Sequence, residues 1–64
     1  MNVEVHFIDT ELGSLIGDPV QTTLRQFADE NNCPPMYVMR QEIRENGAYV
    51  TTTFGGIRVE VRRR

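Results

Sequence analysis

Polar and apolar residues alternate along the first segment of the chain. Residues 2–9 read NVEVHFID, with valine or phenylalanine at positions 3, 5 and 7. A period of two is typical of a strand that buries one face. Two glycines between residues 10 and 17 indicate a loop or the return of a hairpin. The pattern therefore predicts an N-terminal strand over residues 2–9, followed by a turn of the chain.

The apolar spacing becomes helical after residue 18. The residues that would share one face of this helix are Val20, Leu24, Phe27 and Ala28. Two starting points stay open, because Asp18 before Pro19 is typical of a helix start and Thr23 with Gln26 forms a second capping box. The helix is expected to end at the asparagines at positions 31 and 32, since asparagine tolerates the left-handed conformation.

A second helix is predicted after the two prolines at positions 34 and 35. The apolar residues with helical spacing are Met36, Met39 and Ile43. Most residues between them favour a helix, and Gly47 would end it. Tyr37 and Val38 favour a strand instead. A strand over residues 36–44 therefore stays an alternative.

The last part of the chain predicts a β-hairpin. Residues 48–54 and 57–62 are two strand-like runs that flank Gly55 and Gly56, the signal of a two-residue turn. The apolar face in that register consists of the pairs Phe54 with Ile57, Thr52 with Val59, and Val50 with Val61. A turn of this type requires a positive φ at Gly55.

Together these elements predict one small α+β domain over residues 1–64, with an N-terminal strand, a helix-turn-helix and a C-terminal β-hairpin. A ubiquitin-like β-grasp is the alternative, with a first hairpin at 2–17, a single helix at 22–32 and the remaining strands within 36–62. The two folds differ at residues 36–46, which are helical in the first and a strand in the second.

Composition limits what can stabilise so short a chain. It has 64 residues and one cysteine, which excludes an internal disulfide. Cys33 and His6 are too few ligands for a structural zinc ion, which takes four, and no cofactor is indicated. Small domains without such links depend on packing or self-association, so a homodimer is one expectation. Without a long apolar run or a signal peptide, we expect a cytoplasmic protein that does not associate with membranes.

Charge is distributed unevenly along the chain. Residues 1–32 hold six of the nine acidic residues and one arginine, whereas residues 33–64 hold the other six arginines and three acidic residues. The basic half can attract phosphate, and the acidic half limits indiscriminate binding. Solvation of a small surface would explain the same distribution.

No catalytic site is indicated by the sequence. Ser14, His6 and several aspartates are present, but nothing in their spacing brings them together as a triad. The two adjacent glycines form a shorter pattern than phosphate-binding loops need. We therefore expect a binding protein and no enzyme.

The arrangement of helix, sharp turn, helix and hairpin suggests a DNA-binding surface. With the apolar residues of 36–45 turned inward, its outer side carries residue types that reach base edges and phosphates. The hairpin would contribute a wing along the DNA backbone. The residues expected at DNA are Tyr37, Arg40, Gln41, Arg44, Thr53, Arg58, Arg62 and Arg63.

The stretch from Thr23 to Gln41, TLRQFADENNCPPMYVMRQ, resembles the winged helix-turn-helix of MerR-type regulators and phage excisionases. The matching features are Phe27-Ala28, a small apolar residue at the turn (Cys33), and P-x-x-V-x-R from Pro35 to Arg40. The segment TFGGIR at 53–58 is similar to the glycine-tipped wing of that family. The resemblance implies a small accessory protein or transcription regulator that binds DNA without catalysis, with Arg40 at bases and the wing on phosphates.

The β-grasp alternative implies a different function. Such a domain would be a protein-binding module, acting as an adaptor or as an inhibitor of a larger protein machine. The acidic N-terminal half suits that role. Because Arg40 and Arg44 project from a helix in one fold and join a sheet in the other, the conformation of residues 36–46 separates the two hypotheses.

Overall fold

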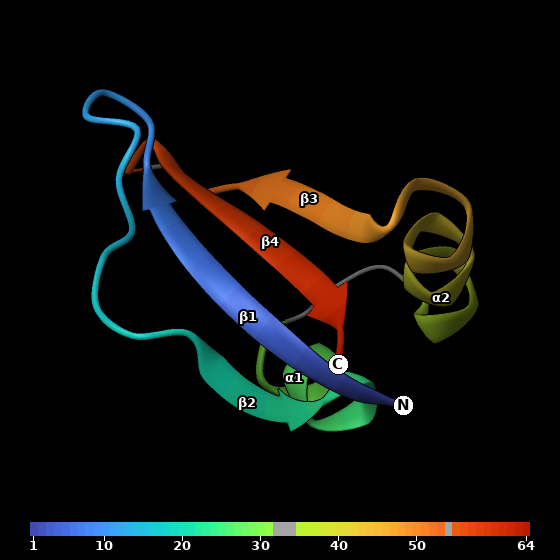
Figure 1. Ribbon diagram of the computed structural model, residues 1–64. Coiled ribbons are helices and arrows are strands. Elements are labelled where there is room, and N and C mark those ends of the chain that lie inside the picture. Colours follow the sequence, from blue (N-terminus) through green and yellow to red (C-terminus); the bar gives the residue numbers. More distant parts are fainter. Residues whose placement is uncertain (32–34, 54) are drawn as a thin grey trace.

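The alternating residues at the start of the chain form a strand in the interior of an antiparallel sheet. A computed structural model describes residues 1–31, 35–53 and 55–64 (Figure 1). Its elements in chain order are β1 (Asn2–Asp9), β2 (Val20–Thr23), α1 (Leu24–Asn31), α2 (Met36–Asn46), β3 (Ala48–Thr52) and β4 (Ile57–Arg63). The strands lie in the order β2-β1-β4-β3, and every neighbouring pair is antiparallel. The protein is therefore a small α+β domain, as the sequence predicts.

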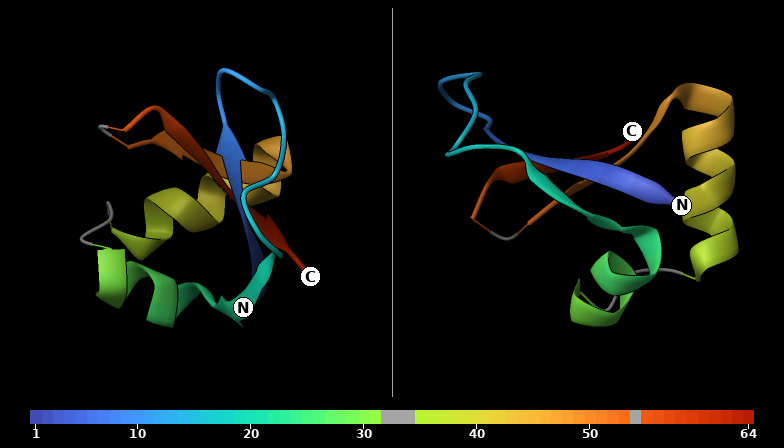
Figure 2. Two further views of the ribbon diagram at one scale, coloured as in Figure 1. Left: turned by 90° about the vertical axis from the view of Figure 1, so that its left-hand side faces the viewer. Right: turned by 60° about the horizontal axis from the view of Figure 1, so that its bottom comes forward.

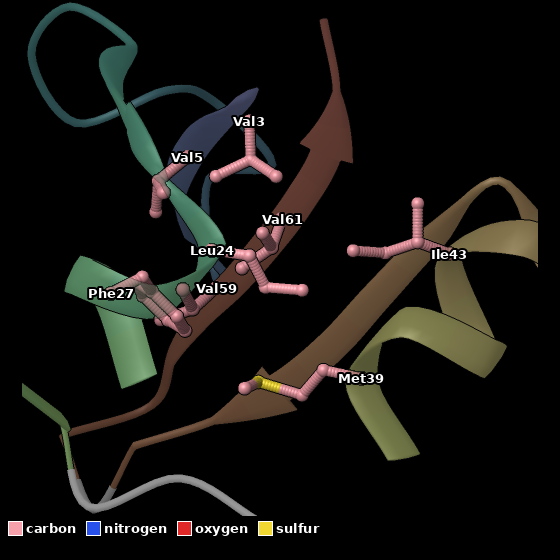
Figure 3. Close-up of a cluster of buried hydrophobic side chains, with 8 residues drawn as sticks. All are labelled: Val3, Val5, Leu24, Phe27, Met39, Ile43, Val59 and Val61. Carbon is pink, nitrogen blue, oxygen red and sulfur yellow. The ribbon is translucent and has the colours of Figure 1, made fainter. Parts of the chain in front are cut away.

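Both helices pack against the same face of this sheet (Figure 2). Side chains at every second strand position meet the inward side chains of α1 and α2 (Figure 3). The buried core consists of Val3, Val5, Leu24, Phe27, Met39, Ile43, Val59 and Val61. The opposite face carries polar side chains such as Glu4, His6 and Glu60, which follow from the same alternation.

The first helix begins at the second of its two possible starts. The backbone N–H of Gln26 donates to Oγ1 of Thr23 over 3.2 Å, so Thr23 caps α1. The helical prediction for Val20 is wrong, because Val20 belongs to strand β2 and pairs with Val5 of β1. Sheet pairing therefore replaces the turn of helix that Asp18 and Pro19 favour. At the other end, the side-chain amide of Asn31 donates to the carbonyl of Phe27.

Residues 36–46 are helical, which decides between the two predicted folds. Met39 and Ile43 are buried, and Met36 packs beside them, as their spacing predicts. Gly47 ends α2 with a φ of 83° and donates its N–H to the carbonyl of Ile43. The β-grasp alternative is wrong because its single-helix arrangement requires a strand where α2 lies.

The C-terminal hairpin forms, but its register differs from the predicted one. Val50 lies opposite Glu60, and Thr52 lies opposite Arg58. The bond from Thr53 N–H to the carbonyl of Ile57 leaves three residues in the connection where two were predicted. One extra residue exchanges the faces of a strand, so Tyr49 and Thr51 turn toward the helices.

Of the two adjacent glycines in the hairpin connection, Gly56 has the positive φ, at 77°, so the prediction of a positive φ at Gly55 is wrong. A three-residue connection of this kind places its left-handed residue last. The predictions for Asn32, Cys33, Pro34 and Phe54 concern positions outside the described residues. No helix among the described residues is long and apolar enough to span a bilayer.

Candidate nucleic-acid interface

The outer side of α2 presents the polar residues that its amphipathic pattern predicts. Tyr37, Arg40, Gln41 and Arg44 are exposed, and Tyr37 keeps 69% of its surface accessible. Together with Glu45 they line a shallow hollow. Gln41 Nε2 lies 3.3 Å from the Glu45 carboxylate. The four predicted residues of this helix therefore share one surface.

A second hollow of about 480 Å³ lies where α2 meets the ends of β1 and β4. Its lining includes Asn2, Arg44, Arg63 and Arg64, and the backbone N–H of Arg64 donates to the carbonyl of Asn2. We call Arg44, Arg63 and Arg64 the arginine cluster. Arg44 lines both hollows, so the cluster is continuous with the outer side of α2.

The two other arginines of β4, Arg58 and Arg62, share one carboxylate partner. Arg58 Nε lies 2.9 Å from Glu60 Oε2, and Arg62 Nη2 lies 2.7 Å from Glu60 Oε1. Glu60 is only 7% exposed. The hydrogen bond from Arg62, aided by the positive charge of Arg58, lowers the pKa of Glu60 although burial opposes the shift. Arg58 and Arg62 are thus held on the outer face of the sheet.

The arginine cluster has no such carboxylate partner. Within the part of the chain that the structure describes, no ion pair involves Arg44, Arg63 or Arg64, and the same holds for Arg40. Cationic side chains without partners are available to an external anion, and arginine matches phosphate through two parallel hydrogen bonds.

Strand direction separates the predicted wing from this surface. Arg63 pairs with Val3 at the α2 end of β1, whereas Ile57 pairs with Asp9 at its other end. The β3–β4 connection therefore lies far from α2 (Figure 1). There the Thr10 hydroxyl donates to the Gly56 carbonyl. Within one chain, Thr53 and Arg58 consequently do not share the surface of α2.

The end of the sheet opposite α2 is acidic. Asp9 closes β1, and Glu11 and Asp18 belong to the connection between β1 and β2. The carboxylate of Asp9 accepts the backbone N–H groups of Glu11 and Leu12 at 2.8 and 3.0 Å, which fixes that turn. The uneven charge along the sequence thus becomes a separation of charge along the strands.

Sequence reasoning missed Asn2 and Arg64 as neighbours of Arg44. The run of arginines from 62 to 64 was a visible signal, but its contact with α2 depends on the pairing of β1 with β4. Arg62 belonged to the predicted set and instead lies on the sheet with Glu60.

The remaining titratable residues of the described chain are spread over its surface and form no metal-binding group. Among the described residues, no group of three or more histidine, cysteine, aspartate or glutamate side chains could hold a metal ion. His6 Nε2 lies 2.7 Å from the carboxylate of Glu4 on the outer face of the sheet. This contact satisfies both side chains locally.

Comparison with protein-family models, curated proteins and solved structures gives no match. The similarity to MerR-type regulators and excisionases accordingly rests on the short motifs of the sequence.

Proposed function

We propose that the protein binds DNA without catalysing a reaction, through the outer side of α2 and the arginine cluster. The observation that carries the proposal is that Arg44 of α2, Arg63 at the end of β4 and Arg64 line one hollow. These guanidinium groups have no carboxylate partner in the described chain. Such a surface suits the phosphate backbone, which supplies most of the affinity in non-specific DNA binding.

The residues of α2 add groups that can contact bases. Arginine pairs with the major-groove edge of guanine, and glutamine pairs with that of adenine. Arg40 and Gln41 lie exposed on the same helix side as Arg44. In this proposal the arginine cluster sets the position on the backbone, while Arg40 and Gln41 supply sequence preference.

The acidic end of the molecule supports this orientation. With a net charge of −2, the whole chain is repelled by DNA at long range. The separation of charge lets the arginine end approach while Asp9 and Glu11 point away. We therefore expect weak, strongly salt-dependent binding to random DNA and tighter binding to a specific site.

The test is a salt titration of binding to a fluorescent random duplex, measured by anisotropy. The logarithm of the association constant should fall linearly with the logarithm of salt concentration, because arginines displace counterions. Arg44→Gln and Arg63→Gln should each reduce the slope by about one. Arg58→Gln is the matched control, since it removes the same charge from β4 at the acidic end while Arg62 still binds Glu60.

The results separate the interface from general charge. Smaller slopes for Arg44→Gln and Arg63→Gln, with little change for Arg58→Gln, support the proposed surface. Equal effects of all three substitutions would mean that net charge alone governs binding. No binding at low salt would contradict DNA binding.

A protein-binding function is the second candidate, and the β1–β2 connection favours it. Leu12 is 78% exposed, and Leu15 and Ile16 are exposed beside the acidic residues Glu11 and Asp18. Apolar side chains ringed by charge are typical of protein interfaces. Capture of a specific protein by the native chain, lost in Leu12→Ser and retained in Arg44→Gln, would favour this function.

A further inference from the structure

The edge strand β3 carries backbone groups that no part of the described chain uses. It is the last strand in the sheet order, and no other element runs along its outer side (Figure 1). The bond from Thr53 N–H to the Ile57 carbonyl fixes which residues bond to β4. Hydrogen-bonded and non-bonded positions alternate in an antiparallel pair. The outward N–H and C=O groups therefore belong to Ala48, Val50 and Thr52.

The side chains of β3 do nothing to block pairing. Natural edge strands are protected by charged residues, prolines, bulges or very short length. β3 reads AYVTT over five residues, without charge or proline. Its central residue, Val50, is 44% exposed on the face opposite the helices. The strand is therefore a template for another strand.

The other edge of the sheet differs. β2 spans four residues, and Pro19 comes directly before it. The outward positions on this edge are 19, 21 and 23, because the alternate residues Val20 and Thr22 pair with Val5 and Val3, and Thr23 is the cap of α1. Proline has no N–H to donate, so only Gln21 within β2 offers a full pairing position before the helix cap. This edge is protected, and β3 is not.

We propose that β3 pairs antiparallel with β3 of a second copy of this chain, which joins the two sheets. A twofold axis through Val50 pairs that residue with Val50 of the second copy, and pairs Ala48 with Thr52. Every outward backbone group of the strand then has a partner, since positions 48, 50 and 52 all face the seam. The register also places no charged side chain opposite another.

Charge complementarity favours the same arrangement. Antiparallel pairing places the acidic end of each sheet, with Asp9 and Glu11, at the same end as the arginine cluster of the other copy. A parallel arrangement would put like ends together. Pairing also covers part of the exposed Val50 side chain on the face opposite the helices.

The dimer has a consequence for the candidate interface. The axis is perpendicular to the joined sheet, so α1 and α2 of both copies lie on the same face. The β3–β4 connection of one copy then lies beside the α2 end of the other. Thr53, which is far from α2 within one chain, approaches α2 of the second copy, whereas Arg58 stays with Glu60 on the face opposite the helices.

The experiment measures association by analytical ultracentrifugation over a range of protein concentrations, without DNA. The native chain should approach twice the 7.4 kDa of one chain. Val50→Lys should weaken association about tenfold or more, because two like charges meet at the axis and the valine contact is lost. Gln21→Lys is the matched control, since it adds the same charge to an exposed site on the other edge strand.

Circular dichroism shows whether each variant keeps the fold, and Thr52→Lys provides a second, weaker probe opposite Ala48. A native chain that stays monomeric at high concentration would overturn the proposal, as would a Val50→Lys variant that associates like the native chain. Because the mass is measured without DNA, failure of the dimer and failure of DNA binding are distinguished.

Discussion

At the scale of single residues, two positions in the C-terminal hairpin determine its geometry. Gly56 takes a φ of 77°, which L side chains rarely adopt. Glu60 joins two arginines on the outer face of the sheet while its own side chain is buried. The role of Gly56 depends on its backbone conformation, whereas the role of Glu60 depends on its charge.

Gly56→Ala should lower the free energy of unfolding by about 1–2 kcal/mol, because a Cβ in the left-handed region is strained. The added Cβ would also lie 3.4 Å from Oγ1 of Thr10. Gly55→Ala is the control, since Gly55 has no positive φ and its Cβ would meet only Thr53 Oγ1 at 4.0 Å. Urea denaturation measures both. Equal losses would contradict the three-residue connection.

Glu60→Gln should destabilise the protein by about 1–2 kcal/mol at pH 7, because it weakens charged hydrogen bonds to half-exposed arginines. The lowered pKa of Glu60 means that its ionised form stabilises the fold above the unfolded pKa of about 4.5. That stabilisation is lost as pH falls through the folded pKa.

The difference in unfolding free energy between the native chain and Glu60→Gln should therefore shrink as the pH falls below the unfolded pKa of about 4.5. Denaturation at several pH values measures it. The control is Glu11→Gln, because Glu11 is exposed and takes part in no ion pair among the described residues. A difference that stays constant with pH would contradict the role of Glu60.

At the scale of elements, α2 is held against the sheet by a narrow apolar side. Met39 and Ile43 are its buried residues, while the polar residues on its other side stay exposed. Few apolar side chains therefore orient the surface that the proposed function uses. The stability of this helix against the sheet depends on them.

Met39→Ala should lower the free energy of unfolding by about 2–5 kcal/mol, because it leaves a cavity in the core. Met39→Leu conserves volume and should cost less than about 1.5 kcal/mol. Chemical denaturation followed by circular dichroism compares the two. Similar small losses would mean that α2 is not anchored at Met39.

At the scale of the whole molecule, the direction of the strands gives the sheet one basic end and one acidic end. β1 begins beside the arginine cluster and finishes at Asp9, while β4 runs back toward Arg63. The proposed DNA interface uses the arginine end. The proposed dimer places the arginine end of one copy at the same end of the joined sheet as the acidic end of the other copy. Both proposals therefore depend on the antiparallel pairing of β1 with β4.

Local sequence patterns determined most of the elements. The alternation in residues 2–9, the spacing of Met39 and Ile43, and the left-handed ending at Gly47 each act within a few residues. Such preferences are therefore legible without tertiary contacts. The exposed polar side of α2 followed from the same helical period.

Tertiary structure alone decided where these elements meet. Val20 joined a strand because β1 offered backbone partners, although its local signals favoured a helix. The register of the hairpin differs by one residue from the predicted one, because the length of the turn and the burial of the two strands depend on each other. As a result Tyr49 faces the helices and Val50 faces away from them. Arg44 and Arg63 share a hollow only through the order of the strands, since contacts between distant residues depend on the whole sheet.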